Sequence, residues 1–100
     1  MADTPEVKVK KKIKEVLNAH EVYFVMPIGT GYGNSGVPDF LCCVEGKFVA
    51  IEAKAGNNRP TALQEKHLWE IEEKGGVAMV INEQNLMAFD GYIRLLKDKK

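Results

Sequence analysis

Apolar residues near the start of the chain recur at the spacing of an amphipathic helix. They are Val9, Ile13, Val16 and Leu17. Thr4 precedes Pro5, and this pair is typical of a helix start, because threonine accepts from free backbone N–H groups and proline fits the first turn. The pattern therefore predicts a helix over residues 4–19 that buries one stripe of side chains.

Three later apolar runs predict short strands. They are VYFVMPI, FLCCV and FVAIEA, at residues 22–28, 40–44 and 48–53. The first run ends at Pro27 and at the segment GTGYGNSG, which we expect to be a loop, because glycine loses much backbone freedom in a regular element. The turn Glu45-Gly46-Lys47 separates the other two runs, which are therefore expected to pair as a hairpin.

The next segment predicts a helix followed by a buried strand. Thr61 and Gln64 match a capping box, so we expect a helix over residues 61–74 that stops at two glycines. The run VAMVI, residues 77–81, lacks polar alternation. It is therefore predicted to be a strand buried on both faces.

The end of the chain predicts helix from about Asn85. The apolar stripe there consists of Leu86, Phe89, Ile93 and Leu96. Gly91 weakens this stretch, so two short helices are an alternative. The predicted order is α-β-β-β-α-β-α, an α/β (α+β) fold with a mixed sheet flanked by helices.

The length of the chain indicates one domain over residues 1–100. A core of this size is modest, which makes self-association a reasonable expectation. No apolar run approaches the roughly 20 residues of a membrane span, and the start does not resemble a secretory signal. The adjacent Cys42 and Cys43 point to opposite faces of a strand, so we expect free thiols and an intracellular, cytoplasmic protein.

Charge is balanced overall but unevenly distributed. The formal net charge is zero, which argues mildly against a nucleic-acid binder that relies on bulk attraction. Lysines nevertheless crowd both ends of the chain: Lys8, Lys10, Lys11, Lys12, Lys14, Lys97, Lys99 and Lys100. A basic helix either solvates an exposed face or contacts phosphate, and both interpretations stay open.

Three charged residues lie at the ends of the predicted hairpin. Asp39 precedes the first strand, while Glu52 and Lys54 share one face at the end of the second. Pairing of the strands brings the two carboxylates together, and a divalent cation such as Mg²⁺ would balance their charge. Lys54 would then activate a bound water or stabilise charge on phosphate. The alternative is an exposed ion pair, worth under about 1 kcal/mol.

These residues resemble the motif of the PD-(D/E)xK nuclease superfamily, and their surroundings resemble its VRR-NUC branch. The matching residues are Gly36, Val37, Pro38, Asp39, Glu52, Ala53, Lys54, Thr61, Gln64, Trp69, Gly75 and Gly76. The branch includes small stand-alone phage and bacterial nucleases, and it is similar in layout to archaeal Holliday-junction resolvases. The resemblance covers nearly the whole chain. It implies a restriction-endonuclease-like core and a metal-dependent DNA endonuclease, selective for branched DNA such as four-way junctions.

The resemblance also implies a role for each matching residue. Asp39 and Glu52 would bind Mg²⁺ or Mn²⁺ together with the backbone carbonyl of Ala53. Lys54 would be the catalytic lysine. Gln64 would be a further catalytic residue that places phosphate or water, although it equally fits the third position of the capping box.

The family carries one more glutamate on the first helix, for which Glu6 and Glu15 are the candidates. Glu15 lies about 200° around the helix from Ile13, on the solvent face. Glu6 precedes Ile13 by seven residues and therefore shares the buried stripe. We expect Glu6 to join the metal site; the alternative is a first-turn acid favoured by the helix dipole.

Several further residues are candidates for contact with DNA. They are Lys8, Lys11, Lys12, Tyr32 and Asn34. The glycine-rich loop that holds the last two lacks the Gly-Lys-Ser/Thr ending of a nucleotide-binding loop. Leu68 and Trp69 are expected in the core or at a subunit interface.

The leading hypothesis is a homodimeric endonuclease that presents two sites to branched DNA. A second hypothesis is a non-catalytic DNA-binding or assembly module. The presence of Asp39, Glu52 and Lys54 together argues against it, because a degenerate site would lack at least one of them. A third is a nuclease subunit that needs a partner, and only the activity of the purified chain decides that.

Overall fold

The computed structural model describes residues 3–28 and 36–98, so the candidates Tyr32 and Asn34 lie outside the described residues. The elements follow the predicted order. They are α1 (Pro5–Ala19), β1 (Tyr23–Val25), β2 (Phe40–Val44), β3 (Lys47–Ala53), α2 (Ala62–Glu73), β4 (Val77–Ile81) and α3 (Leu86–Asp98). The α/β fold with a mixed sheet is therefore confirmed.

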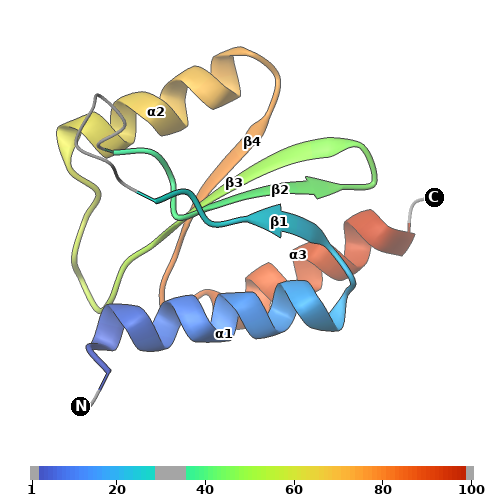
Figure 1. Ribbon diagram of the computed structural model, residues 1–100, viewed down its shortest axis with the longest axis horizontal. Helices are drawn as coiled ribbons and strands as arrows, with labels where there is room; N and C mark the ends of the chain where they lie inside the picture. Colours follow the sequence, from blue (N-terminus) through green and yellow to red (C-terminus); the bar gives the residue numbers. More distant parts are fainter. Residues whose placement is uncertain (1–2, 29–35, 99–100) are drawn as a thin grey trace.

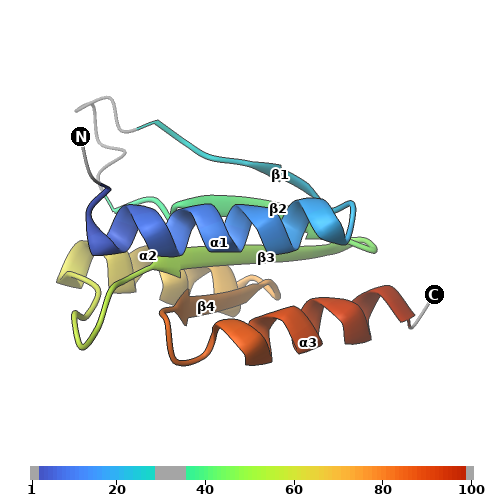
Figure 2. The same ribbon diagram turned by 90° about the horizontal axis from the view of Figure 1, so that it is seen from below.

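The four strands form one sheet in the order β1-β2-β3-β4. The pairs β1–β2 and β2–β3 are antiparallel, and β4 runs parallel to β3. A parallel pair needs a crossover connection, which α2 supplies. Figures 1 and 2 show α1 and α3 on one side of the sheet and α2 on the other. The two helix layers thus leave the strand ends between them.

The core lies between the sheet and the pair formed by α1 and α3. The predicted stripe of α1 is buried at Val9, Ile13 and Leu17, and α3 buries Phe89 and Ile93. The strands add Phe40, Cys42, Val44, Val49, Ile51, Ala53 and Ile81. Cys43 is exposed beside the buried Cys42, and both are free thiols, as alternation along a strand requires. Burial raises the pKa of the Cys42 thiol to about 12.

Two of the predicted strands differ from expectation. The first was expected over residues 22–28 but β1 spans only Tyr23–Val25, because pairing stops at Val25 opposite Leu41 and Pro27 has no N–H to continue it. The expectation that residues 77–81 are buried on both faces was wrong. Only Ile81 is buried, because β4 is the last strand of the described sheet.

The helices exclude one alternative in each of two predictions. The last helix is continuous from Leu86 to Asp98, so the alternative of two short helices is wrong. Packing of Phe89 and Ile93 on the sheet outweighs the cost of Gly91, about 1 kcal/mol. Trp69 is 60% exposed and does not lie in the core, so of its two expected places only a subunit interface stays as a prediction. No helix in the described ranges is long and apolar enough to cross a membrane.

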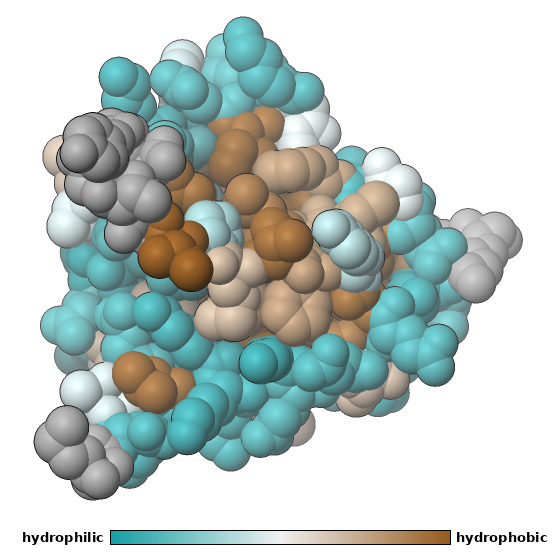
Figure 3. Space-filling view, in the orientation of Figure 1, coloured by the Kyte–Doolittle hydropathy of each residue, from teal (hydrophilic) through white to brown (hydrophobic). Residues whose placement is uncertain are grey.

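One face of the sheet is only partly covered. On the side of α2, neighbouring strands pair Tyr23 with Cys43, Val25 with Leu41, and Cys43 with Phe48. We call these five residues the open sheet face. Tyr23 is 71% exposed, Phe48 47% and Val25 44%. Figure 3 shows apolar side chains gathered between α2 and α1, over the strands.

Candidate active site

A tight hairpin sets the register that builds the site. Glu45 and Gly46 both have positive φ angles, 51° and 85°, as a two-residue hairpin turn requires. Lys47, predicted as part of the turn, instead pairs with Val44. At the other end Phe40 pairs with Ile51, so the residues just beyond them, Asp39 and Glu52, come to the same strand end.

Asp39 is held by the backbone of the strand beside it. The N–H of Ala53 donates to Asp39 Oδ2 at 2.8 Å. Asp39 Oδ1 lies 3.4 Å from Lys10 Nζ on α1. Asp39 Oδ2 is therefore bound to the protein backbone, and Asp39 Oδ1 faces the ammonium group of Lys10.

Glu52 is the most deeply buried charged residue among the residues that the structure describes. It is only 1% exposed. Its Oε2 lies 3.7 Å from Lys54 Nζ, and its Oε1 is buried with no hydrogen-bond partner among the described residues. Burial and, to a lesser extent, the negative charge of Asp39 together raise the pKa of Glu52 to about 7, against the opposing effect of the positive charge of Lys54. A buried carboxylate oxygen without a partner, next to a second carboxylate, fits a site for a cation.

Backbone groups complete this strand end. The N–H of Lys54 donates to the carbonyl of Ile81 at 3.0 Å, which anchors Lys54 to β4. Ala53 is extended, so its carbonyl lies on the same strand edge as the N–H that Asp39 accepts from. Three oxygen atoms at this strand end are therefore candidates for binding a metal ion: Asp39 Oδ1, Glu52 Oε1 and the Ala53 carbonyl oxygen. This is the kind of set that Mg²⁺ or Mn²⁺ prefers.

The segment before Asp39 packs against the first turn of α2. Gly36 has φ +85°, and a Cβ built there would lie 2.8 Å from Leu63 Cγ and 3.0 Å from the Leu63 carbonyl carbon. Only glycine fits this approach without a shift of the neighbouring backbone. The residues Gly36 to Pro38 therefore bring the start of β2 close to α2, and the side chain of Pro38 is fully buried.

Gln64 sits in the first turn of α2. Its N–H donates to Thr61 Oγ1 at 3.2 Å, and its Oε1 accepts from the Thr61 N–H at 2.9 Å. The predicted capping box is confirmed. These bonds engage the side-chain oxygen of Gln64, and a catalytic role for it stays a prediction.

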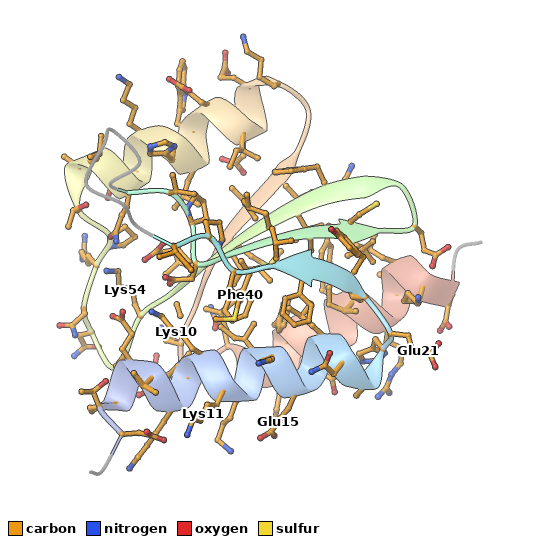
Figure 4. All side chains as sticks on the ribbon, in the orientation of Figure 1. Lys10, Lys11, Glu15, Glu21, Phe40 and Lys54 are labelled. Atoms are coloured by element: carbon orange, nitrogen blue, oxygen red, sulfur yellow. The ribbon has the colours of Figure 1, made fainter. Side chains whose placement is uncertain are left out.

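The charged side chains of α1 divide between the site and solvent. Figure 4 shows Lys10 directed from α1 towards the strand ends, whereas Lys11 and Glu15 point away from the sheet. Glu6 Oε2 lies 4.0 Å from Lys10 Nζ, and the charge of Glu6 makes a small contribution to the raised pKa of Glu52. Within residues 3–28 and 36–98, no three His, Cys, Asp or Glu side chains come together as a metal cluster. The pair is Asp39 and Glu52, and direct metal binding by Glu6 stays a prediction.

Lys10 is the site residue that the sequence pattern did not single out. It was one of several lysines in a basic segment, and its contact with Asp39 bridges 29 positions of sequence. One local signal points to it: it follows Glu6 by four residues on the same helix face. The contact itself depends on how α1 packs on the sheet.

The other basic candidates lie elsewhere. Lys8 and Lys12 line a hollow of about 490 Å³ together with Leu86, the first residue of α3, and Glu83 in the turn before it. Lys11 Nζ pairs with Asp3 at 2.6 Å on the outer side of α1. None of these contacts involves Asp39 or Glu52, so DNA contact by these lysines stays a prediction.

The fold of the chain is similar to that of solved structures. No family sequence model matches the chain, and no curated protein does. A solved structure described as "VRR_NUC domain" superposes with a TM-score of 0.70 at 22% identity, over 96% of this chain and 97% of that one. A second, a "VRR_NUC domain protein", gives 0.68 at 18% identity, over 95% and 93%. The chain therefore has the fold of VRR_NUC domains.

Proposed function

We propose that this protein is a metal-dependent DNA endonuclease of the VRR-NUC type. The observation that carries the proposal is the buried Glu52 oxygen without a hydrogen-bond partner, beside Asp39 and within reach of Lys54. A carboxylate is costly to bury without a counter-charge. Its position at the end of the strand pair, on a VRR_NUC fold, supports a functional explanation over a structural one.

The residues of the chain divide the chemistry between them. Asp39 Oδ1, Glu52 Oε1 and the Ala53 carbonyl would hold Mg²⁺ or Mn²⁺, which supplies a polarised phosphate and a nucleophilic water when bound. The Ala53 N–H keeps Asp39 oriented through its other oxygen. The ammonium group of Lys54, held near Glu52, would stabilise the negative charge that develops on the phosphate.

The proposal includes a homodimer that acts on branched DNA. The open sheet face exposes aromatic and aliphatic side chains, and it is the face on which Asp39 and Glu52 lie at the strand end. A second copy seated on this face would cover the apolar surface and direct two sites towards one DNA molecule. Two symmetric sites would cut opposite strands of a junction.

The free, exposed Cys43 supports a reducing, intracellular location.

Cleavage of labelled DNA by the purified protein tests the proposal. Four-way junction, flap and duplex substrates are incubated with Mg²⁺, Mn²⁺ or EDTA. We expect metal-dependent cutting of junctions that falls at least 100-fold in Glu52→Gln and Lys54→Met, since each removes a group of the proposed site. Glu15→Gln, an exposed acid on α1, is the matched control and is expected to cut normally.

The possible outcomes separate the alternatives. Binding of DNA without cutting under any condition would favour the assembly module. Absence of both cutting and binding would favour a subunit that needs a partner. Cutting that survives in Glu52→Gln would show that the activity lies at a different site.

A further inference from the structure

Each of the two site carboxylates has its own lysine. Lys54 Nζ lies 3.7 Å from Glu52, and Lys10 Nζ lies 3.4 Å from Asp39. The two lysines come from different elements and differ in exposure. Lys54 follows β3 and is nearly buried, whereas Lys10 reaches the site from α1 and its side chain is 31% exposed. Lys10 is therefore the cation that has room to move.

The two oxygens of Asp39 are not equivalent. Oδ2 accepts from the Ala53 N–H at 2.8 Å, so it is committed to the fold. Oδ1 is left for an external ligand, and it is the oxygen that Lys10 contacts. A divalent cation and the Lys10 ammonium would therefore require the same atom, and their positive charges would repel each other at that distance.

Glu6 offers Lys10 a second partner. Its Oε2 lies 4.0 Å from Lys10 Nζ, one helical turn away on the same face of α1. Lys10 thus lies between an acid of the site and an acid of its own helix. A small rotation of its flexible side chain would exchange one partner for the other.

We propose that Lys10 is a positioning residue that occupies Asp39 Oδ1 in the metal-free protein and transfers to Glu6 when a divalent cation binds. This inference rests on the metal site of the proposed function. It gives Glu6 a role different from that of a metal ligand: Glu6 receives the displaced lysine. Lys10 thereby holds the metal-free site together and lowers its affinity for metal.

Binding of Mn²⁺ to the protein without DNA tests the inference, by titration calorimetry at fixed pH. Lys10→Gln removes the competing charge, so we expect its Kd for Mn²⁺ to fall about fivefold or more. Lys10→Arg keeps the charge and is expected to bind as the wild type does. Lys14→Gln, an exposed lysine on the same helix, is the matched control for the loss of one positive charge.

A double-mutant cycle separates the two roles of Glu6. If Glu6 receives Lys10, Glu6→Gln weakens Mn²⁺ binding about threefold or more in the wild type but has no effect in a Lys10→Gln background. If Glu6 is itself a metal ligand, the substitution weakens binding equally in both backgrounds, which overturns this part of the inference.

The remaining outcomes are also distinct. Wild-type protein that binds no Mn²⁺ overturns the metal site and with it this inference. Wild-type protein that binds Mn²⁺, with Lys10→Gln binding equally or more weakly, overturns the inference alone. A tighter Kd is not what loss of structure produces, and circular dichroism checks that the variants are folded; Lys10→Met replaces Lys10→Gln if the latter is not.

Discussion

At the scale of single residues, Glu52 places a carboxyl group in the interior, where its ionised form lowers the stability of the fold. Its carboxyl group is buried beside Asp39, and the positive charge of Lys54 offsets only part of the penalty. Such a group destabilises the metal-free fold whenever it is ionised. A fold that buries it regardless is consistent with a site that is completed by a cation.

This arrangement predicts how stability depends on pH. The pKa of Glu52 is raised from 4.5 to about 7 in the folded protein. Between these values the folded protein keeps a proton that the unfolded chain has released, so the free energy of unfolding falls as pH rises. The loss amounts to about 3 kcal/mol and is complete above pH 7. Urea unfolding with EDTA at pH 4.5 to 8 measures it.

Glu52→Gln is the control for this prediction, because it is expected to remove most of the decline. Bound Mn²⁺ is expected to reverse the slope in the wild type, since the cation needs the ionised carboxylate. If the wild type and Glu52→Gln show parallel pH profiles in EDTA, then Glu52 is not the titrating group.

The residue scale also shows what the sequence could reveal about the site. Asp39, Glu52 and Lys54 were predicted from a short hairpin, because a local turn and the two-residue period of a strand determine where they lie. The approach of Lys10 could not be predicted in this way, because it depends on the packing of α1 on the sheet. The sequence therefore predicts the geometry within the hairpin, but it does not predict contacts between elements that are distant in the chain.

At the scale of elements, helix stripes were easier to predict than strand burial. The period of 3.6 residues identified the buried faces of α1 and α3 directly. The apolar run of β4 indicated a strand, but its exposure depends on its place at the edge of the sheet. That place is a property of topology, which an apolar run does not encode.

Two glycines provide an opposed pair of predictions for the elements. Gly36→Ala is expected to lower the free energy of unfolding by roughly 1–3 kcal/mol, because its φ is positive and its Cβ would meet the backbone of Leu63. Gly91→Ala is expected to raise it by up to about 1 kcal/mol, because a Cβ there meets nothing within 4 Å on an exposed helix face.

Urea denaturation of both variants tests the pair. Equal stability of Gly36→Ala and the wild type would mean that the start of β2 does not need its close approach to α2. The same variant is expected to lose cleavage activity together with stability, since the segment leads directly to Asp39.

At the scale of the whole molecule, the open sheet face is the feature that the fold leaves unexplained for a single chain. Its five residues lie on β1, β2 and β3 beside the proposed site. Exposed apolar patches of this kind mark surfaces for association. Near-zero net charge also removes the long-range repulsion that would keep copies apart.

The open sheet face predicts a dimer that a single charge disrupts. Tyr23 is 71% exposed and lies across from Cys43, so Tyr23→Glu should leave the folded monomer nearly as stable as before. In a dimer seated on this face the same carboxylate would be buried without a partner, so the dimer Kd is expected to rise at least tenfold. Sedimentation equilibrium measures this change.

Met87→Glu on α3, where the methionine is 89% exposed, is the matched control and is expected to leave the dimer intact. A wild-type protein that sediments as a monomer at micromolar concentration would contradict the dimer, while cleavage of plain duplex by that monomer would still be consistent with the site.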